Sequence, residues 1–218
     1  MWAVVPLKSP AAAKTRLSEA LSPVQRRELF FLMARQVIGS LLGAPGIARV
    51  AVITASDEVA DFAESLGAWI IREEREAGTA AACRAAVAAS AGRTPSLLMM
   101  SGDLPLASTA AIEPLARLGG RSPLVAIVGD RRRQGTNALL CSPPDVIPMC
   151  FGPDSFRRHV AARRPEVALE IVESDALSLD IDDEQDLHEL QRRALTGAAP
   201  GLDALRAVLA AGGSVLVE

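Results

Sequence analysis

The sequence predicts one α/β domain built on a mostly parallel sheet. Short apolar runs of the strand type alternate with helix-type segments over residues 1–120. Half of the 218 residues are hydrophobic and 22% are charged, which suits a core that needs neither a disulfide nor a metal. The alternation implies parallel strands with helices on both faces. We therefore assign residues 1–195 to a single domain and residues 196–218 to a C-terminal tail.

Four strands and four helices are expected in the first half of the chain. The apolar runs predict strands at residues 2–6, 50–54, 68–71 and 96–101. A helix should begin at Ser22-Pro23-Val24-Gln25, because Ser22 can act as the N-cap and Gln25 can close a capping box. Apolar residues at helical spacing extend this helix to about Leu42. Further helices are expected at residues 57–66, 79–91 and 108–118.

The pattern changes after residue 120. Two apolar runs, 124–128 and 138–141, flank a polar loop and predict an antiparallel pair. The remaining expected elements are a helix at 154–164, strands at 167–172 and 179–181, and a helix at 184–195. The tail has a Gly- and Pro-containing linker and then a short helix near residues 203–210.

Composition excludes several function classes. The formal charge of −3, the absence of Tyr and the 3% aromatic content argue against nucleic acid as a partner. No apolar run reaches the ~18 residues that span a bilayer, and the N-terminus lacks the apolar region of a signal peptide, so no membrane partner is expected. Cys83, Cys141 and Cys150 have no metal-type spacing, which favours buried thiols in a reducing, cytoplasmic location.

The loop after the first expected strand is the first candidate site. Of 23 basic residues only two are lysines, Lys8 and Lys14, and both lie in this loop. Together with Arg16 they place three cations beside hydroxyls and small residues, a combination that can bind a polyphosphate. The lysines would matter if the site requires a compact ammonium group. The alternatives are a solvated loop and a codon bias toward Arg.

Two acidic segments are candidate magnesium ligands. Asp103 follows the fourth expected strand, where ligands of parallel sheets bind, and Mg²⁺ is held by one or two carboxylates plus substrate phosphates. The alternative role of Asp103 is an Asx-turn. Asp182, expected to share a strand face with Asp180, is the candidate second ligand. Its alternative role is a capping box with Gln185 for the following helix.

Two polar turns, at residues 135–137 and 151–156, complete the candidate site. Ser155 lies in the first turn of an expected helix, where free N–H groups attract anions, whereas Asp154 is better explained as an N-cap. His159 and His188 have no evident nucleophile as a partner and are expected on the surface. The sequence therefore favours a reaction that uses a metal and cations rather than a protein nucleophile.

Taken in order, the motifs resemble those of a known family. They are Val4-Val5-Pro6-x-Lys8, Ala13-Lys14-Thr15-Arg16-Leu17, Gly102-Asp103-Leu104-Pro105, Gly135-Thr136-Asn137, Phe151-Gly152-x-x-Ser155-Phe156-x-x-His159 and Asp180-Ile181-Asp182. Together they resemble the 2-phospho-L-lactate guanylyltransferases of coenzyme F(420) biosynthesis, whose actinobacterial relatives use phosphoenolpyruvate. The resemblance covers residues 1–195. It implies a Rossmann-like (GT-A-like) nucleotidyltransferase fold with three layers and a mostly parallel mixed sheet.

The resemblance also implies a reaction and a set of site residues. Family members transfer GMP from GTP to a small phosphorylated three-carbon acid, release pyrophosphate and use Mg²⁺. The acceptor phosphate is largely dianionic at neutral pH, so charge neutralisation and positioning are needed rather than a general base. The implied residues are Lys14, Arg16 and Asp103 for catalysis; Pro6, Lys8, Lys14, Gly78 and Asp103 for the nucleotide; Thr136, Gly152 and Ser155 for the acceptor; and Asp103 and Asp182 for the metal.

One position departs from the family pattern. Ala80 stands where family members commonly have Asn after the third strand, and its side chain cannot donate or accept a hydrogen bond. A same-fold enzyme with another nucleotide or acceptor, such as 3-phosphoglycerate or a molybdopterin, is therefore an alternative. A non-catalytic nucleotide-binding protein is another. The apolar run at residues 30–33 fits either the core or the interface of a homo-oligomer.

Overall fold

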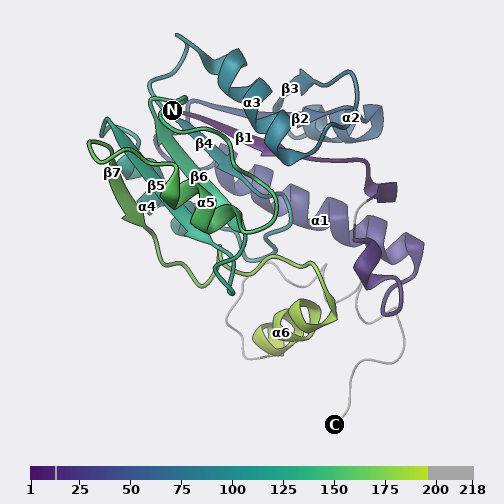
Figure 1. Ribbon diagram of the computed structural model, residues 1–218. Coiled ribbons are helices and arrows are strands. Elements are labelled where there is room, and N and C mark those ends of the chain that lie inside the picture. The colour runs from purple at the N-terminus through teal and green to yellow at the C-terminus, as the bar shows by residue number, and fades with distance from the viewer. Residues whose placement is uncertain (13, 196–218) are drawn as a thin grey trace.

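A single mixed sheet organises the protein. The computed structural model describes residues 1–12 and 14–195, so the expected tail and its helix near residues 203–210 lie outside the described residues. Seven strands pair in the order β3-β2-β1-β4-β6-β5-β7 (Figure 1). They are β1 (Trp2–Pro6), β2 (Arg49–Thr54), β3 (Trp69–Arg72), β4 (Leu97–Met100), β5 (Leu124–Gly129), β6 (Thr136–Ser142) and β7 (Ala168–Ile171). Only β6 runs antiparallel to its neighbours, which confirms a mostly parallel sheet.

Helices cover both faces of this sheet and make three layers. Three pack on one face: α1 (Pro23–Leu42), α2 (Asp57–Ser65) and α4 (Thr109–Leu118). Two pack on the other: α3 (Thr79–Ser90) and α5 (Ser155–Ala161). Successive side chains of a strand point to opposite faces, so in β1 Ala3 and Val5 join the first core and Val4 joins the second.

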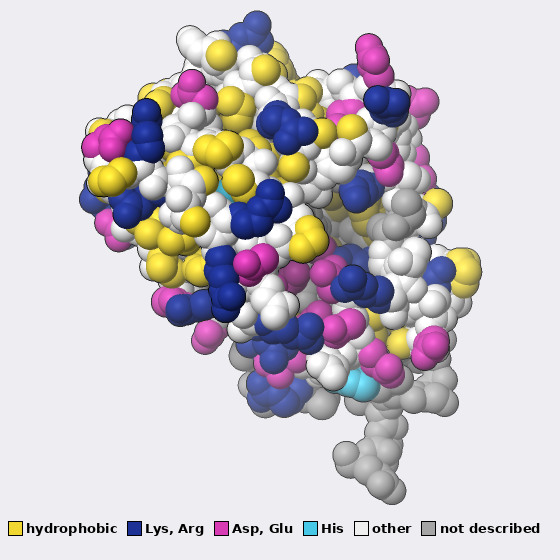
Figure 2. All heavy atoms as spheres, in the orientation of Figure 1, with side chains coloured by type: hydrophobic (Ala, Val, Ile, Leu, Met, Phe, Trp, Pro, Cys, Tyr) yellow, Lys and Arg dark blue, Asp and Glu magenta, His cyan; other side chains and the backbone are white. Residues whose placement is uncertain are grey.

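The last described helix, α6 (Glu184–Leu195), lies outside these layers (Figure 1). Its Leu187 and Leu190 pack in a third core with Leu17, from the 3₁₀ helix Thr15–Leu17, and with Leu29 of α1. This packing brings α6 beside the loop that follows β1. On the surface, basic and acidic side chains are interspersed over α6 and the adjoining loops (Figure 2).

Most expected elements are confirmed to within a few residues. The capping box of α1 is present, because Ser22 Oγ accepts from Gln25 N at 3.3 Å and Gln25 Oε1 accepts from Ser22 N at 2.9 Å. The apolar run at residues 30–33 contributes to the core through buried Phe30 and Met33. Among the described residues, no helix is both long and apolar enough to cross a membrane.

Two expectations about elements are wrong. Residues 179–181 do not form a strand. They are irregular and are held by one backbone bond, from Ile181 N to Asp103 O at 3.3 Å. Their apolar side chains, Leu179 and Ile181, are buried against the third core and not on the sheet. The helix expected at 154–164 is shorter, because α5 covers only Ser155–Ala161.

The strand order places three loops together. The parallel neighbours β1 and β4 both end at one edge of the sheet, so the loops that follow them leave side by side. Strand β6 is antiparallel to β4, with Ala138 opposite Met100, so β6 begins at this same edge. Lys14, Asp103 and Thr136 therefore come from distant parts of the sequence to one region.

Candidate active site

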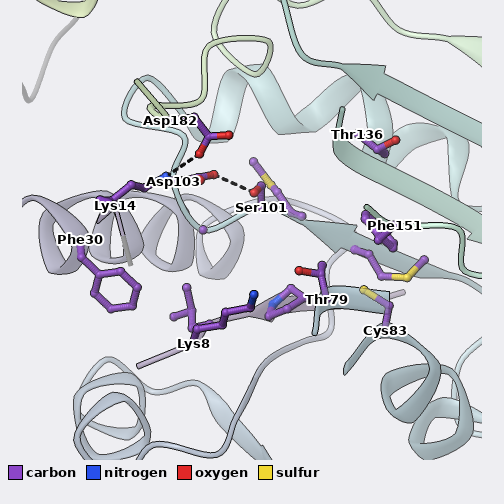
Figure 3. Close-up of a pocket in the computed structure, with 15 residues that line it drawn as sticks. Lys8, Lys14, Phe30, Thr79, Cys83, Ser101, Asp103, Thr136, Phe151 and Asp182 are labelled. Carbon is purple, nitrogen blue, oxygen red and sulfur yellow. Dashed lines mark hydrogen bonds and ion pairs between the residues drawn. The ribbon is translucent and has the colours of Figure 1, made fainter. Parts of the chain in front are cut away.

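A cavity of about 410 Å³ lies at this edge of the sheet (Figure 3). Its walls come from the end of β1 and the following loop, the start of α3, the end of β4 and its loop, and the start of β6. The segment before α6 adds Asp182. The polar residues that line the cavity are Lys8, Lys14, Thr79, Ser101, Asp103, Thr136 and Asp182.

Lys14 joins two carboxylates at one end of the cavity. Its Nζ lies 2.6 Å from Asp103 Oδ2 and 3.1 Å from Asp182 Oδ1, and its side chain is 8% exposed (Figure 3). The Lys14 backbone is left-handed, with φ of 57°, which is uncommon for a residue other than glycine. The two ion pairs hold the side chain of this strained residue toward the cavity.

The segment before Asp103 sets the position of its carboxylate. Ser101 Oγ donates to Asp103 Oδ1 at 2.7 Å, so each carboxylate oxygen has a partner. A Cβ atom at Gly102 would lie 2.3 Å from Leu7 Cδ2, so a larger residue there would displace the Leu7 side chain. The carboxylate of Asp103 is therefore held in one position by Lys14 and Ser101.

The charges of this cluster are set by the neighbouring groups. Burial by itself lowers the pKa of the Lys14 ammonium, but attraction and hydrogen bonds from Asp103 and Asp182 raise the pKa above its ordinary value. Burial raises the pKa of Asp103, but the Lys14 charge and the hydrogen bonds from Lys14 and Ser101 outweigh it, and the pKa lies below its ordinary value. One ammonium thus faces two carboxylates at neutral pH, which leaves an excess of negative charge.

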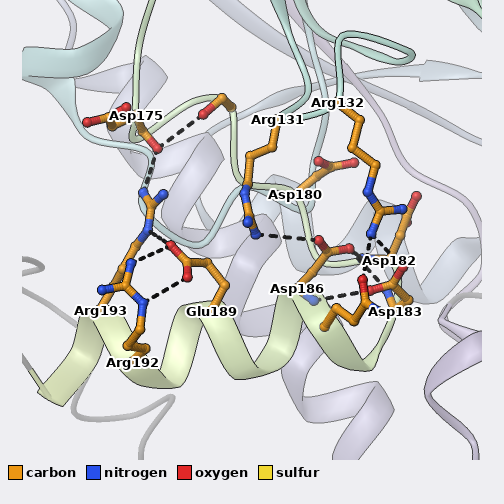
Figure 4. A network of polar contacts seen from close by, with 12 residues as sticks. Arg131, Arg132, Asp175, Asp180, Asp182, Asp183, Asp186, Glu189, Arg192 and Arg193 are labelled. Atoms are coloured by element: carbon orange, nitrogen blue, oxygen red, sulfur yellow. Dashed lines mark hydrogen bonds and ion pairs between the residues drawn. The ribbon is translucent and has the colours of Figure 1, made fainter.

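The Asp182 side chain can contact Lys14 because two neighbouring residues, and not Asp182, cap α6 (Figure 4). The expected capping box of Asp182 with Gln185 is wrong by one residue. Asp183 Oδ1 accepts from Asp186 N at 3.1 Å, and Asp186 Oδ2 accepts from Asp183 N at 3.2 Å and from Asp182 N at 3.1 Å. Gln185 instead accepts a hydrogen bond from Arg132. The Asp182 side chain, 54% exposed, reaches Lys14.

Asp180 lies behind the cluster and contacts β6. Its Oδ1 accepts from Asn137 Nδ2 at 3.3 Å, and the same amide donates to Leu177 O at 3.0 Å. Burial, followed by the charges of Asp103 and Asp182, raises the pKa of Asp180 to about 7. Asn137 thus connects the start of β6 to the segment that presents Asp182.

The opposite end of the cavity holds Thr136 and Phe151 (Figure 3). Thr136 Oγ1 lies 3.1 Å from Ser155 Oγ and 3.1 Å from His159 Nδ1. The expectation that His159 is a surface residue is wrong, because its side chain is fully buried and its ring packs edge-on against Phe151. Asp154 precedes α5 with φ of 55°, but its side chain makes no capping bond, so the expected N-cap role is also wrong.

The donor set at the first end fits a magnesium ion. Asp103 and Asp182 both aim an oxygen at one cation, the Lys14 ammonium, so the geometry already brackets a position for positive charge. Within residues 1–12 and 14–195, no group of three or more His, Cys, Asp or Glu forms a metal cluster. Two carboxylates without a third protein ligand suit Mg²⁺, which takes its other ligands from water and substrate phosphates.

Comparison with known proteins decides the family. The family model described as "Guanylyl transferase CofC like" matches residues 1–195. The chain belongs to this family.

Similar proteins carry guanylyltransferase names. Phosphoenolpyruvate guanylyltransferase of Rubrobacter xylanophilus is 38% identical over 195 residues, which cover 88% of this chain and 93% of that protein. 2-Phospho-L-lactate guanylyltransferase of Methanothermobacter thermautotrophicus is 33% identical and covers 86% of this chain and 82% of its own length. A solved nucleotidyl transferase from Methanothermobacter superimposes with a TM-score of 0.63 at 17% identity, covering 89% of this chain and 97% of that chain. The expected nucleotidyltransferase fold is confirmed.

Not every expected residue of this CofC-like chain reaches the cavity. Pro6, Lys8, Lys14, Asp103, Thr136 and Asp182 line it. Ser155 contacts it through Thr136, Gly78 is the N-cap of α3 with φ of 91°, and Gly152 is an exposed glycine with φ of 121°. Arg16 lies in a neighbouring cavity of about 120 Å³ that Asp180, Asp183 and Asp186 also line. Arg16 thus lies among acidic residues outside the main cavity, and its catalytic role stays a prediction.

Sequence reasoning assigned no role to several residues that shape the site of this family member. Ser101, Thr79, Cys83 and Phe151 line the cavity, and His159 supports it from behind. Burial raises the pKa of Cys83 to about 12, so its thiol is neutral and serves as apolar wall. The helical spacing of Ser155 and His159, four residues apart, was the available signal for His159, since it places both on one face of α5.

Proposed function

We propose that this protein transfers GMP from GTP to phosphoenolpyruvate or 2-phospho-L-lactate, with release of pyrophosphate and dependence on Mg²⁺. One observation carries the proposal: Lys14 bridges Asp103 and Asp182 at the edge of the cavity, in a chain of a guanylyl transferase family. Relatives at 38% and 33% identity are named for these two acceptors, which supports a three-carbon phospho-acid as the substrate class.

The reaction needs charge control more than proton transfer. An oxygen of the acceptor phosphate forms a bond to the α-phosphorus of GTP, and the bond from that phosphorus to the bridging oxygen of pyrophosphate breaks. The acceptor oxygen is already ionised, since the second pKa of a phosphate ester is about 6. Lys14 supplies a buried positive charge where the negative charge of the GTP phosphates and the acceptor phosphate gathers, and Lys8 supplies an exposed one.

Asp103 and Asp182 would hold the magnesium ion. When bound, the ion neutralises and orients the reacting phosphates. Ser101 keeps Asp103 in place through its 2.7 Å hydrogen bond, and the cap of α6 leaves Asp182 unoccupied by helix contacts. Fixed carboxylates lower the cost of reorganisation, because they do not have to move when the substrates bind.

The segment at the start of α3 supports a second candidate function. Thr79, in the first turn of α3, is the residue of the Gly78-Thr79-Ala80 segment that lines the cavity, and Ala80 does not. Thr79 can donate and accept a hydrogen bond, whereas Ala80 can do neither. A transferase with a relaxed nucleotide preference is therefore the second candidate function.

A substrate panel tests both candidates. The purified protein is incubated with Mg²⁺, one of GTP, ATP, CTP or UTP, and one of phosphoenolpyruvate, 2-phospho-L-lactate or 3-phosphoglycerate, and pyrophosphate release is followed. The proposal expects the highest kcat/KM with GTP and one of the first two acids. Comparable rates with CTP or ATP would favour the second candidate, and no pyrophosphate from any pair would contradict both.

Asp103→Asn gives the matched test of the site. The substitution keeps the shape of the side chain and removes its charge, so turnover should fall by roughly 100-fold or more while the fold persists. Asp61→Asn makes the same chemical change at an exposed position on α2 and should leave turnover unchanged. Equal turnover in the two variants would show that Asp103 does not hold the metal.

A further inference from the structure

A buried polar chain supports the end of the cavity formed by β6. Thr136 lines the cavity, and behind it His159 of α5 is fully buried. His159 has two neighbours at hydrogen-bond distance. Its Nδ1 lies 3.1 Å from Thr136 Oγ1, and its Nε2 accepts from the backbone N–H of Cys150 at 2.9 Å. The transfer chemistry described above makes no use of this imidazole.

The contacts of His159 determine which ring nitrogen carries the proton. A backbone N–H can only donate, so Nε2 must accept and cannot be protonated. A neutral imidazole then carries its one proton on Nδ1, and this proton is donated to Thr136 Oγ1. Burial, and to a smaller extent the charge of Arg158, lowers the pKa of His159 to about 4, so the ring is neutral at physiological pH.

This tautomer defines the role of the Thr136 hydroxyl. A hydroxyl has one proton and two acceptor lone pairs. Thr136 Oγ1 accepts from His159 Nδ1 and also from Ser155 Oγ at 3.1 Å, so both lone pairs are occupied. Ser155 is 2% exposed and does not line the cavity, so its own proton is directed to Thr136. The proton of the Thr136 hydroxyl is used in neither of these contacts, and Thr136 lines the cavity.

We infer that His159 is a positioning residue that makes Thr136 an obligate hydrogen-bond donor to an anionic oxygen of the acceptor acid. The inference rests on the proposed function for the identity of the acceptor. Hydrogen bonds to charged groups are among the stronger ones, and a donor whose lone pairs are both occupied cannot rotate to serve a competing ligand that only donates. His159 thereby increases affinity and selectivity for the acceptor acid without contacting it.

Two substitutions at position 159 separate this role from a structural one. His159→Asn retains an N–H donor near the place of Nδ1 and loses the acceptor for Cys150 N. His159→Gln reaches the place of Nε2, so it can retain that acceptor and loses the donor to Thr136. We expect His159→Gln to raise the KM of phosphoenolpyruvate by roughly tenfold or more and to leave the KM of GTP unchanged, whereas His159→Asn stays near the wild type. Equal effects of the two substitutions on acceptor KM would overturn the inference.

A double-mutant cycle tests whether His159 acts through Thr136. Thr136→Val removes the hydroxyl at nearly constant volume and should raise the acceptor KM by a similar factor. His159→Gln added to Thr136→Val should then have no further effect on this KM. A further increase of the same size would show that His159 acts by another route. The exposed substitution His188→Gln is the control, and melting temperatures confirm that each variant is folded.

Binding measurements keep the test independent of turnover. Calorimetric titration of phosphoenolpyruvate in the presence of Mg²⁺ and a non-hydrolysable GTP analogue should show the same contrast between His159→Gln and His159→Asn. Lactate and methyl phosphate, titrated separately, identify the bound group, because only the one with the contacted anion loses affinity in His159→Gln. Absence of pyrophosphate release in the wild type would contradict the proposed function alone. Unchanged affinity for all three ligands would contradict the inference.

Discussion

At the scale of single residues, a buried ammonium organises the candidate site. Lys14 contacts Asp103 and Asp182, which come from segments far apart in the sequence, and its side chain is almost fully enclosed. The other lysine, Lys8, is exposed at the mouth of the same cavity. The clustering of both lysines in one loop therefore corresponds to a shared place in the structure, although their environments differ.

Lys14→Arg tests whether the compact ammonium is required. A guanidinium is larger and planar, so it does not fit between two carboxylates that bracket one nitrogen at 2.6 and 3.1 Å. We expect kcat for pyrophosphate release to fall by at least about tenfold. Lys8→Arg is the matched comparison and should cost less, since an exposed side chain tolerates the larger group. Equal losses of kcat in the two variants would indicate that the lysine pattern reflects codon bias alone.

His159 predicts a dependence of stability on pH. In the unfolded chain its pKa returns to about 6.5, so below that pH the unfolded state binds a proton that the folded state does not bind until about pH 4. The contribution of His159 to the free energy of unfolding should therefore decrease as the pH falls through this window, by about 2 kcal/mol between pH 7 and pH 5. Asp180, with its pKa raised to about 7, contributes in the opposite direction, so the His159 contribution is measured as a difference between variants. Around the ring lie Thr136, the Cys150 N–H and Phe151, and Arg158 is the charged neighbour that shifts its pKa.

Urea unfolding at pH 7 and pH 5 measures this effect. Relative to the wild type, His159→Asn should gain about 2 kcal/mol in free energy of unfolding between pH 7 and pH 5, because the buried imidazole is gone while Asp180 is retained. His188→Asn removes the only other histidine, which is exposed, and should preserve the wild-type slope. A wild-type slope in His159→Asn would assign the pH dependence to the carboxylates instead.

At the scale of elements, the start of α6 separates an aspartate that caps the helix from one that contacts Lys14. Asp183 and Asp186 exchange the capping hydrogen bonds (Figure 4). Asp182, one residue earlier, is directed to Lys14 (Figure 3). The two roles belong to adjacent residues because the backbone turns from the irregular segment into the helix at this point. A shift of one residue would exchange the helix cap for the partner of Lys14.

Alanine substitutions of Asp182 and Asp183 should have opposite effects on turnover and on stability. Asp183→Ala removes the N-cap and should lower the free energy of unfolding by about 1 kcal/mol, with a smaller effect on turnover. Asp182→Ala should change stability less, since the side chain is half exposed and Lys14 keeps Asp103, but it should reduce turnover strongly. Urea unfolding and pyrophosphate release measure the two effects. If Asp182→Ala proved the more destabilising, the cap would lie where the sequence pattern suggested.

At the scale of the whole molecule, substrate binding should depend on the proposed metal. The cavity is built from loops after β1 and β4, the start of β6 and the segment before α6, so a ligand that fills it connects all of these parts. Because such a ligand binds the folded state only, it should stabilise the protein as a unit.

Thermal unfolding measures this linkage. GTP with Mg²⁺, at about 100 times its Kd, should raise the Tm by roughly 5–10 °C. GTP with a chelator should raise it far less, and so should GTP with Mg²⁺ added to Asp103→Asn. An equal rise in Tm with the chelator would contradict the assignment of Asp103 and Asp182 as metal ligands.

Local patterns in the sequence determined the elements of this protein. Strand alternation, helical spacing and the Ser22–Gln25 box depend on neighbours within a few residues, so they predicted the α/β class and most element bounds. The loop residues Lys14 and Asp103 followed from the same reasoning, because ligands bind beyond the carboxyl ends of parallel strands.

Only the tertiary structure decided which loops meet and which side chains are buried. Residues 179–181 are apolar enough for a strand, yet Leu179 and Ile181 pack against Leu17 and α6. That packing selects Asp182 as the partner of Lys14 and Asp183 as the cap. His159 is enclosed because α5 packs on β6, a contact between segments joined by a long loop. Such contacts depend on the order of strands in the sheet, which short-range patterns do not encode.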